Sequence, residues 1–357
     1  MKILEVCHRY YPYIGGVEEH VKNISERIAK KFSVTVCTTD PSNELPNYEV
    51  VSGVEVKRFR CWAPNEAYYF SRALKRYLTE NSENYDVVHA HHYHAFPSLY
   101  AAQTKGNKRF VFTPHYHGEG HTFFRSLLHI PYKHVAKKIF EKADSVVCVS
   151  NHEKRLIIEK FNLDSKKFVV IPNGVDMKEF EGFQKKKGEK KVILCVSRLE
   201  RYKGVQYLIE ALARLSQDVV LEVVGDGPHK ESLIELTRKL GAEGRVKFFG
   251  NLPRKALLQK YARADLFALL STHEAFGICI AEALVSKTAC IVANTSALKE
   301  WVDNKNCFGI DLPIDVNKLV ELIGRVIGMK VTGVSLMDWD DVVKQLLRIY
   351  VGDCADS

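Results

Sequence analysis

The chain has 357 residues, of which 46% are apolar and 27% charged, and its formal net charge is +9. This length exceeds that of a typical single domain, and the composition excludes a disordered chain or a coiled coil. No run approaches the ~18 apolar residues of a membrane span, and the first residues lack a signal-peptide core. We therefore expect a cytoplasmic protein of two domains. The basic surplus suits phosphorylated ligands or an anionic lipid surface, and is too dilute to indicate nucleic acid.

The cysteine content agrees with a reducing compartment. Nine cysteines form an odd set without a C-x-x-C pair. Such cysteines are typical of small buried apolar residues, so we predict neither a disulfide framework nor a cysteine-based zinc site.

Short β-branched runs alternate with helical-period segments along the chain, which is typical of parallel α/β layers. A helix is expected at 16–32, where apolar side chains recur at helical spacing from Val17 to Ile28. The strands expected in the first half are Ile3–Cys7, Val34–Thr38, Val54–Phe59, Val87–His91, Phe110–Thr113, Ser145–Val149 and Val169–Ile171.

A charged run at 184–191 predicts a solvated linker, after which the α/β pattern restarts. We therefore interpret the chain as an N-terminal domain, 1–180, a C-terminal domain, 181–337, and a helix within 338–357 that packs back on the first domain. Two such domains predict a ligand in the cleft between them, at the carboxyl ends of the strands. The strands expected in the second domain are Val192–Val196, Val219–Val224, Val246–Phe249, Leu266–Leu270 and Ala289–Ala293, and the helices are Gly204–Leu215, Lys230–Leu240, Arg254–Ala262, Phe276–Val285 and Asp338–Val351.

Paired glycines, Gly15 and Gly16, separate the first expected strand from the first expected helix. Glycines let a backbone approach a ligand closely, and a helix N-terminus attracts negative charge, so this loop predicts a phosphate site. An ordinary strand-to-helix turn explains the pair equally well. The loop lacks the G-x-G-x-x-G pattern, which counts against a dinucleotide-binding oxidoreductase.

A second loop, 197–204, follows the strand Val192–Val196 and leads into a helix. Arg198 and Lys203 offer a planar guanidinium and a mobile ammonium, which can converge on one diphosphate. Solvated surface charge is the alternative for both, and also for Arg201.

Two acidic residues, Glu274 and Glu282, lie eight positions apart near another expected strand end. If both lie on one helix, they share a face about 12 Å apart along its axis. That spacing fits two hydroxyl-bearing groups of a nucleotide sugar. One capping and one exposed glutamate is the alternative. The backbone amides expected to face the same ligand belong to Phe276, Gly277, Ile278 and Cys279.

Histidines concentrate in the first half of the chain, where twelve of the fourteen precede residue 153. His89 and His91 end one expected strand, and His115 and His117 follow the next. Imidazoles are metal ligands, but no carboxylate or cysteine accompanies them at ligand spacing. We therefore predict no metal site, and interpret these histidines as hydrogen-bond partners of sugar hydroxyls or phosphate.

Taken in order, these motifs resemble glycosyltransferase family 4, the retaining GT-B sugar transferases, over Met1 to about Tyr350. The resemblance implies an α/β GT-B fold with two doubly wound Rossmann-like domains facing across a cleft. Its first-half motifs are P-x-x-G-G-x-E, H-x-H, T-x-H, Ala143–Ser150 and Ile171–Asp176, and its second-half motifs are R-x4-K-G, Gly225–Pro228 and E-x7-E.

By this resemblance the donor is a nucleotide-diphosphate hexose, bound mainly by the second domain without a cofactor. Arg198 and Lys203 match the residues that bind the diphosphate. Glu282 matches the residue that binds the ribose hydroxyls, and Glu274 the residue that faces the sugar hydroxyls near the anomeric carbon.

The resemblance also assigns two residues of the first domain. Gly16 matches the loop glycine that approaches the distal phosphate, and His115 matches the histidine that reaches the transferred sugar across the cleft. It implies retention through a front-side, oxocarbenium-like step that needs no metal, because fixed cations and a helix N-terminus stabilise the leaving diphosphate. A covalent route, as in many retaining hydrolases, stays open.

Two segments after Glu282 depart from the family pattern. The family usually continues with a small-Gly-Lys/Thr-Pro-Val-Val segment and a glycine-rich loop, where this chain has Val285–Val292 and Asn294–Ala297. The missing glycines and proline put the geometry of these loops, and with it the donor specificity, in question.

The leading function is transfer of a hexose to a lipid-linked or phosphorylated acceptor. Tyr68–Leu78 predicts a basic amphipathic helix that can bind an anionic membrane surface, although a packed helix with a solvated basic face explains the pattern as well. The alternatives are a transferase that makes a soluble glycoside or sugar phosphate, and a GT-B-like sugar-nucleotide epimerase. The sequence does not determine the base, the hexose, the acceptor or the oligomeric state.

Overall fold

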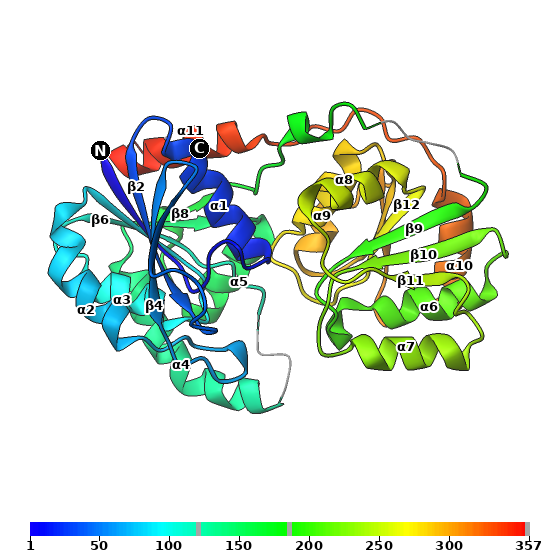
Figure 1. Ribbon diagram of the computed structural model, residues 1–357, viewed down its shortest axis with the longest axis horizontal. Coiled ribbons are helices and arrows are strands. Elements are labelled where there is room, and N and C mark those ends of the chain that lie inside the picture. Colours follow the sequence, from blue (N-terminus) through cyan, green and yellow to red (C-terminus); the bar gives the residue numbers. More distant parts are fainter. Residues whose placement is uncertain (119–122, 184–187, 354–357) are drawn as a thin grey trace. The chain divides into compact units, whose positions relative to one another are not determined.

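The computed structural model describes residues 1–118, 123–183 and 188–353. The chain divides into two compact units (Figure 1): unit 1 is Met1–Gly174 with Trp339–Ser357, and unit 2 is Val175–Asp338. Unit 2 therefore begins before the expected boundary at residue 181. The chain passes from one unit to the other twice, after Gly174 and after Asp338. The two connecting segments run side by side, since Val175 N donates to Met337 O at 2.9 Å. Of the expected linker 184–191, residues 184–187 lie outside the described residues.

Unit 1 contains an eight-stranded sheet in the order β3-β4-β2-β1-β5-β6-β7-β8, parallel except for the β3–β4 pair. The strands expected here are all present, with no end displaced by more than two residues. Only β3 was not predicted, because its side chains are half-buried or exposed and form no buried apolar run. The strands are β1 (Lys2–Val6), β2 (Ser33–Asp40), β3 (Tyr48–Val51), β4 (Val54–Arg60), β5 (Val87–His91), β6 (Arg109–Thr113), β7 (Ser145–Cys148) and β8 (Phe168–Val170).

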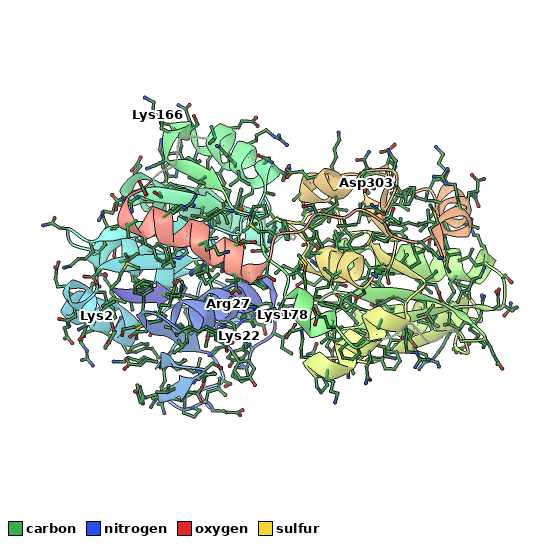
Figure 2. The ribbon with its side chains drawn as sticks, turned by 90° about the horizontal axis from the view of Figure 1, so that it is seen from above. Lys2, Lys22, Arg27, Lys166, Lys178 and Asp303 are labelled. Atoms are coloured by element: carbon green, nitrogen blue, oxygen red, sulfur yellow. The ribbon has the colours of Figure 1, made fainter. Side chains whose placement is uncertain are left out.

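The helices of unit 1 include the last helix of the chain. That helix, α11, packs against α1 and β6, and Figure 1 shows it along α1. Arg27 of α1 (Figure 2) places its Nε 3.2 Å from Oδ1 of Asp340 in α11, so an ion pair reinforces the packing. The helices are α1 (Gly16–Ile28), α2 (Arg72–Asn81), α3 (Phe96–Thr104), α4 (Phe123–Lys142), α5 (Asn151–Phe161) and α11 (Trp339–Val351).

The expected amphipathic helix Tyr68–Leu78 is shorter at its start than predicted. The helix α2 begins at Arg72, because the Ser71 hydroxyl caps it by accepting the Leu74 N–H at 3.2 Å. Phe70 precedes the helix and forms an antiparallel bridge with Trp62. Within the described parts of the chain, no helix has the length and apolar character needed to cross a membrane.

Unit 2 contains a six-stranded parallel sheet in the order β11-β10-β9-β12-β13-β14. The strand order reverses between β9 and β12, which is where α/β sheets bind ligands at the carboxyl ends of their strands. The strands are β9 (Lys191–Val196), β10 (Val219–Val224), β11 (Val246–Phe248), β12 (Leu266–Leu269), β13 (Cys290–Ala293) and β14 (Cys307–Ile310), and the helices are α6 (Val205–Arg214), α7 (Lys230–Lys239), α8 (Arg254–Arg263), α9 (Ile278–Val285) and α10 (Val316–Val326).

Both units are doubly wound Rossmann-like sheets, as the sequence predicts. Each has its own apolar core, built around Phe110 and Phe112 in unit 1 and around Leu221 and Phe267 in unit 2. The eight described cysteines are free thiols, six of them buried, while Cys354 lies outside the described residues.

Candidate functional site

Two loops meet where the strand order of unit 2 reverses. The loop 197–204 follows β9, the loop 271–277 follows β12, and Thr272 N donates to Tyr202 O at 2.9 Å between them. Lys203 Nζ donates to Glu274 Oε1 at 2.6 Å. The structure therefore brings together a cation and a carboxylate that the sequence predicts separately for one ligand.

The Lys203–Glu274 pair is largely shielded from solvent, with side chains 13% and 17% exposed. Burial alone would lower the pKa of Lys203, but attraction to the Glu274 carboxylate outweighs it and raises that pKa. Lys203 is therefore a permanent cation. Because an ammonium carries three N–H donors, Lys203 can bind Glu274 and an anionic ligand at the same time.

Glu274 and Glu282 do not share a helix, contrary to one interpretation of their spacing. The helix α9 begins at Ile278, so Glu274 lies in the loop before it, and Gly277 turns the chain into α9 at φ 96°. Glu282 lies within α9, with a side chain 8% exposed. Glu274 therefore belongs to a loop and Glu282 to a helix.

Arg254, at the start of α8, contacts the predicted site residue Glu282, and the sequence did not single it out. Its Nη1 donates to Glu282 Oε1, and its Nη2 donates to Glu179 Oε2 at 2.6 Å. Arg254 thus fixes the Glu282 carboxylate. Because Arg254 is far from Glu282 in the sequence, nothing in its local pattern distinguishes it from a solvated helix charge.

Arg198 lies in the same loop as Lys203, but its described ion pair is with Glu200, at 3.2 Å. Its side chain is 46% exposed and so is accessible to a ligand. The backbone of Ser197, next to Arg198, packs against the turn that follows β10. Gly225 there has φ 124°, and a Cβ on it would lie 2.0 Å from Ser197 O, so only glycine permits this approach.

The segment from Phe276 to Cys279 is supported by the turn after β13, η6 (Ser296–Trp301). Trp301 Nε1 donates to Phe276 O at 2.8 Å, and the Ser296 hydroxyl accepts the Glu274 N–H at 3.1 Å. Ile278 and Cys279 occupy the first turn of α9, where backbone N–H groups lack acceptors within the helix. Burial raises the pKa of the Cys279 thiol, which keeps it neutral.

The two departures from the family pattern each contain a residue with unusual backbone geometry. Lys287 has φ 59° and Ser296 has φ 49°, both in the left-handed region that favours glycine. These residues adopt a glycine-like backbone at a cost of about 1–2 kcal/mol each. In both loops a residue other than glycine therefore adopts the left-handed conformation that the turn requires.

In unit 1, Gly15 and Gly16 lie at the start of α1, as expected, but they are accompanied by a partly buried ion pair. Glu18 packs so closely that a Cβ on Gly15 would lie 2.3 Å from its Oε2. Arg9 Nε donates to Glu18 Oε1 at 2.9 Å. The loop expected to bind phosphate thus contains a carboxylate as well as a cation.

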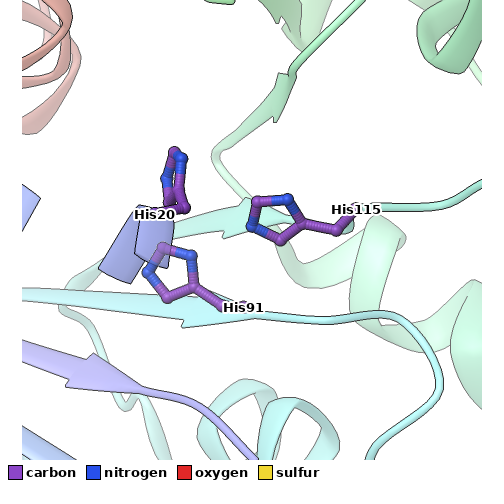
Figure 3. A group of neighbouring side chains, drawn as sticks. All are labelled: His20, His91 and His115. Atoms are coloured by element: carbon purple, nitrogen blue, oxygen red, sulfur yellow. The ribbon is translucent and has the colours of Figure 1, made fainter. Parts of the chain in front are cut away.

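His115 follows β6 with φ 49° and is 7% exposed. His91, at the end of β5, and His20, from α1, are its neighbours, and ring centroids of His20 and His115 lie 4.8 Å apart. The sequence did not single out His20. These three residues are called the histidine cluster below (Figure 3).

A carboxylate accompanies these histidines after all. Glu5 of β1 has Oε2 at 2.7 Å from His91 Nε2 and 3.3 Å from His89 Nδ1. Strand β1 pairs directly with β5, although the two are far apart in the sequence. The spacing of residues in the sequence does not show this carboxylate, because the sheet brings it to the histidines from a distant strand.

Two family models match the chain. The model described as Glycosyltransferase Family 4 matches residues 14–179, and the model described as Glycosyl transferases group 1 matches residues 176–330. Together they cover most of both units.

Curated relatives align over nearly the full length. An uncharacterized glycosyltransferase of Methanocaldococcus jannaschii is 27% identical, with 98% of each chain covered. A glycogen synthase of Mycobacterium tuberculosis is 28% identical, covering 98% of this chain and 94% of the relative. The GPI3 subunit of the phosphatidylinositol N-acetylglucosaminyltransferase of Saccharomyces cerevisiae is 24% identical, covering 99% and 84%.

Solved structures share the fold. HepE of Anabaena, determined in complex with UDP, has a TM-score of 0.77 at 20% identity, covering 99% of this chain and 100% of that chain. Sucrose-phosphate synthase from Thermosynechococcus elongatus has a TM-score of 0.78 at 20% identity, with 100% of both chains covered.

Proposed function

Since the chain belongs to glycosyltransferase family 4 and has the GT-B fold, we propose that it is a retaining enzyme that transfers a hexose from a nucleotide-diphosphate sugar to a lipid-linked or phosphorylated acceptor. The observation that carries the proposal is the Lys203–Glu274 pair at the carboxyl ends of β9 and β12. A cation for the diphosphate and a carboxylate for sugar hydroxyls are adjacent there, as transfer from such a donor requires.

On the donor side, Arg198 and Lys203 bind the diphosphate. Breaking the glycosyl–phosphate bond places negative charge on this leaving group, so fixed cations stabilise the transition state without a metal at the diphosphate. Glu282, positioned by Arg254, accepts hydrogen bonds from the ribose hydroxyls, and Glu274 accepts them from the hexose. The UDP named in the HepE structure supports a nucleotide donor.

In unit 1, His115 faces the transferred hexose, and Gly16 approaches the distal phosphate. These roles follow from the family motifs. The left-handed backbone of His115 supports its assignment, because residues in such strained conformations concentrate at functional sites.

On the acceptor side, the phosphatidylinositol in the name of the yeast relative favours a lipid-linked acceptor. Arg72, Lys75 and Arg76 are exposed on α2 and, with the net charge of +9, suit an anionic cytoplasmic membrane surface. Peripheral binding there would bring the enzyme to its acceptor.

The donor is tested by a thermal-shift screen of UDP-, GDP- and ADP-sugars, in which one donor should raise Tm by several degrees. With that donor, product anomers are assigned by NMR using lipid extracts and, separately, soluble acceptors. Inversion would contradict retention, and conversion of the nucleotide sugar to its epimer without an acceptor would indicate an epimerase. Sedimentation with anionic liposomes tests the membrane, and transfer to soluble acceptors alone would contradict the lipid-linked acceptor.

A further inference from the structure

The histidine cluster brings three buried imidazoles together from three separate elements. His20 is 1% exposed, His91 0% and His115 7%. One ring nitrogen of each lies within 4.8 Å of the others. Figure 3 shows the three side chains beside one another.

Hydrogen bonds fix the tautomers of two of these rings. His20 Nδ1 lies 2.7 Å from Asn173 Oδ1, so Nδ1 is the protonated nitrogen and Nε2 carries a lone pair. His91 Nε2 lies 2.7 Å from the Glu5 carboxylate, so Nε2 is protonated and Nδ1 carries the lone pair.

The remaining nitrogens are buried without a hydrogen-bond partner among the described residues. They are His20 Nε2, His91 Nδ1 and His115 Nε2. Two are acceptors by the argument above, so they cannot satisfy each other, and a buried acceptor without a partner is unfavourable. An electron-pair acceptor shared by all three rings would satisfy them together.

We propose that His20, His91 and His115 form a binding site for a zinc-class divalent metal ion. Imidazole nitrogens bind Zn²⁺ at about 2.0–2.1 Å, and tetrahedral geometry then places ligand nitrogens about 3.3 Å apart, so nitrogens that lie within 4.8 Å of one another must approach by at most about 1.5 Å. Three histidine ligands leave a fourth position for water or another oxygen ligand.

The surroundings of the cluster match those of metal-binding histidines. Such ligands usually donate their second N–H to a carboxylate or carbonyl oxygen, which fixes the ring and makes the ligand more basic. Glu5 provides this for His91, and Asn173 for His20. Glu5 is itself held by the Tyr350 hydroxyl, which donates to Oε1 at 3.1 Å.

A second group, Glu5 with His89 and His91, is also compact enough for a metal ion, but its hydrogen bonds oppose metal binding. His89 Nδ1 lies 2.7 Å from the Tyr350 hydroxyl, and His89 Nε2 lies 2.8 Å from the Thr113 hydroxyl. A metal on His89 would replace one of these bonds. The ion is therefore assigned to the histidine cluster.

The metal site is tested with the full chain, carrying no affinity tag and stripped of metal by a chelator that is then removed. Titration with Co²⁺ alone should give visible d–d absorption bands that saturate at one ion per chain. Zn²⁺ should displace Co²⁺ stoichiometrically, bind with Kd of about 10⁻⁶ M or below, and raise Tm.

Matched variants test which residues bind the ion. His20→Gln and His115→Gln should each weaken Co²⁺ binding by at least about 100-fold, and Asn173→Ala by about 10-fold. His134→Gln, an exposed position on α4, is the control and should bind as the wild type does. Circular dichroism verifies that each variant is folded.

Two results would overturn the site: no saturable binding to the wild-type chain, or unchanged binding in the His20 and His115 variants. If these variants fail to fold, X-ray absorption of the zinc-loaded wild type still decides, because fewer than three imidazole ligands would exclude this cluster. Since every readout uses the metal alone, failure here leaves the proposed transfer reaction intact, and failure to bind a nucleotide sugar leaves the metal site intact.

Discussion

In unit 2 the candidate site pairs opposite charges with each other, whereas unit 1 buries three imidazoles whose facing nitrogens have no hydrogen-bond partner among the described residues. Lys203 pairs with Glu274, and Arg254 with Glu282, at the carboxyl edge of one sheet. At the carboxyl edge of the other sheet, each ring of the histidine cluster has one buried nitrogen without a described partner.

This difference separates two kinds of site. In an ion pair each charge already has its partner, so a ligand there must share or replace contacts that already exist. A buried nitrogen with a lone pair and no partner can bind a cation or accept a hydrogen bond from a hydroxyl group without breaking an existing bond. The paired charges therefore suit a substrate that binds and leaves, and the histidine cluster suits an ion that stays.

The largest effect is expected for Arg198→Ala. Losing a charge-assisted contact of about 2–4 kcal/mol to the leaving diphosphate should lower kcat about 30- to 1000-fold and raise the donor KM. Arg198→Lys should restore little, because the bidentate guanidinium is lost. Steady-state kinetics on Arg201→Ala, a neighbouring exposed cation, provides the control and should match the wild type. If Arg201→Ala abolished activity and Arg198→Ala did not, the diphosphate would not bind at Arg198.

A smaller loss is expected for His115→Ala. If His115 contacts the hexose mainly in the transition state, kcat should fall about 10- to 100-fold while the donor Kd changes less than about threefold. Single-turnover rates and calorimetry on protein stripped of metal by a chelator measure the two quantities, with His134→Ala as the control. Equal losses of binding and turnover would contradict this role.

Arg254→Ala should mainly weaken donor binding. Without Arg254 the Glu282 carboxylate is no longer positioned, so the donor KM should rise about 10-fold while kcat changes less than about threefold, because ribose contacts are equal in the ground and transition states. Arg263→Ala, at the exposed other end of α8, should leave both constants unchanged. A loss confined to kcat would show that Arg254 acts on the chemistry instead.

The smallest effect is expected for added magnesium or manganese. Because Arg198 and Lys203 supply the positive charge at the diphosphate, millimolar Mg²⁺ or Mn²⁺ should change kcat less than about twofold in an assay without other divalent ions. Activity that required either ion would show that the two cations do not suffice. This assay leaves the histidine cluster untested, since hard cations prefer oxygen ligands.

The sequence by itself determined the alternation of strands and helices, because burial within parallel sheets imposes apolar runs that are local in the chain. It also predicted the loops after β9 and β12, since strand ends and glycines such as Gly204 are local features. It did not reveal β3, whose exposed edge has no apolar signature, or the start of α2, which one serine hydroxyl decides.

Only the tertiary structure decided which polar groups meet. The contact of Glu5 with His91 depends on β1 pairing with β5, and that of Arg254 with Glu282 on the packing of two helices. Likewise, His20 joins His91 and His115 only because α1 lies beside the ends of β5 and β6. Such contacts leave no local periodicity, because hydrogen bonds and ion pairs depend on positions in space that the whole fold sets.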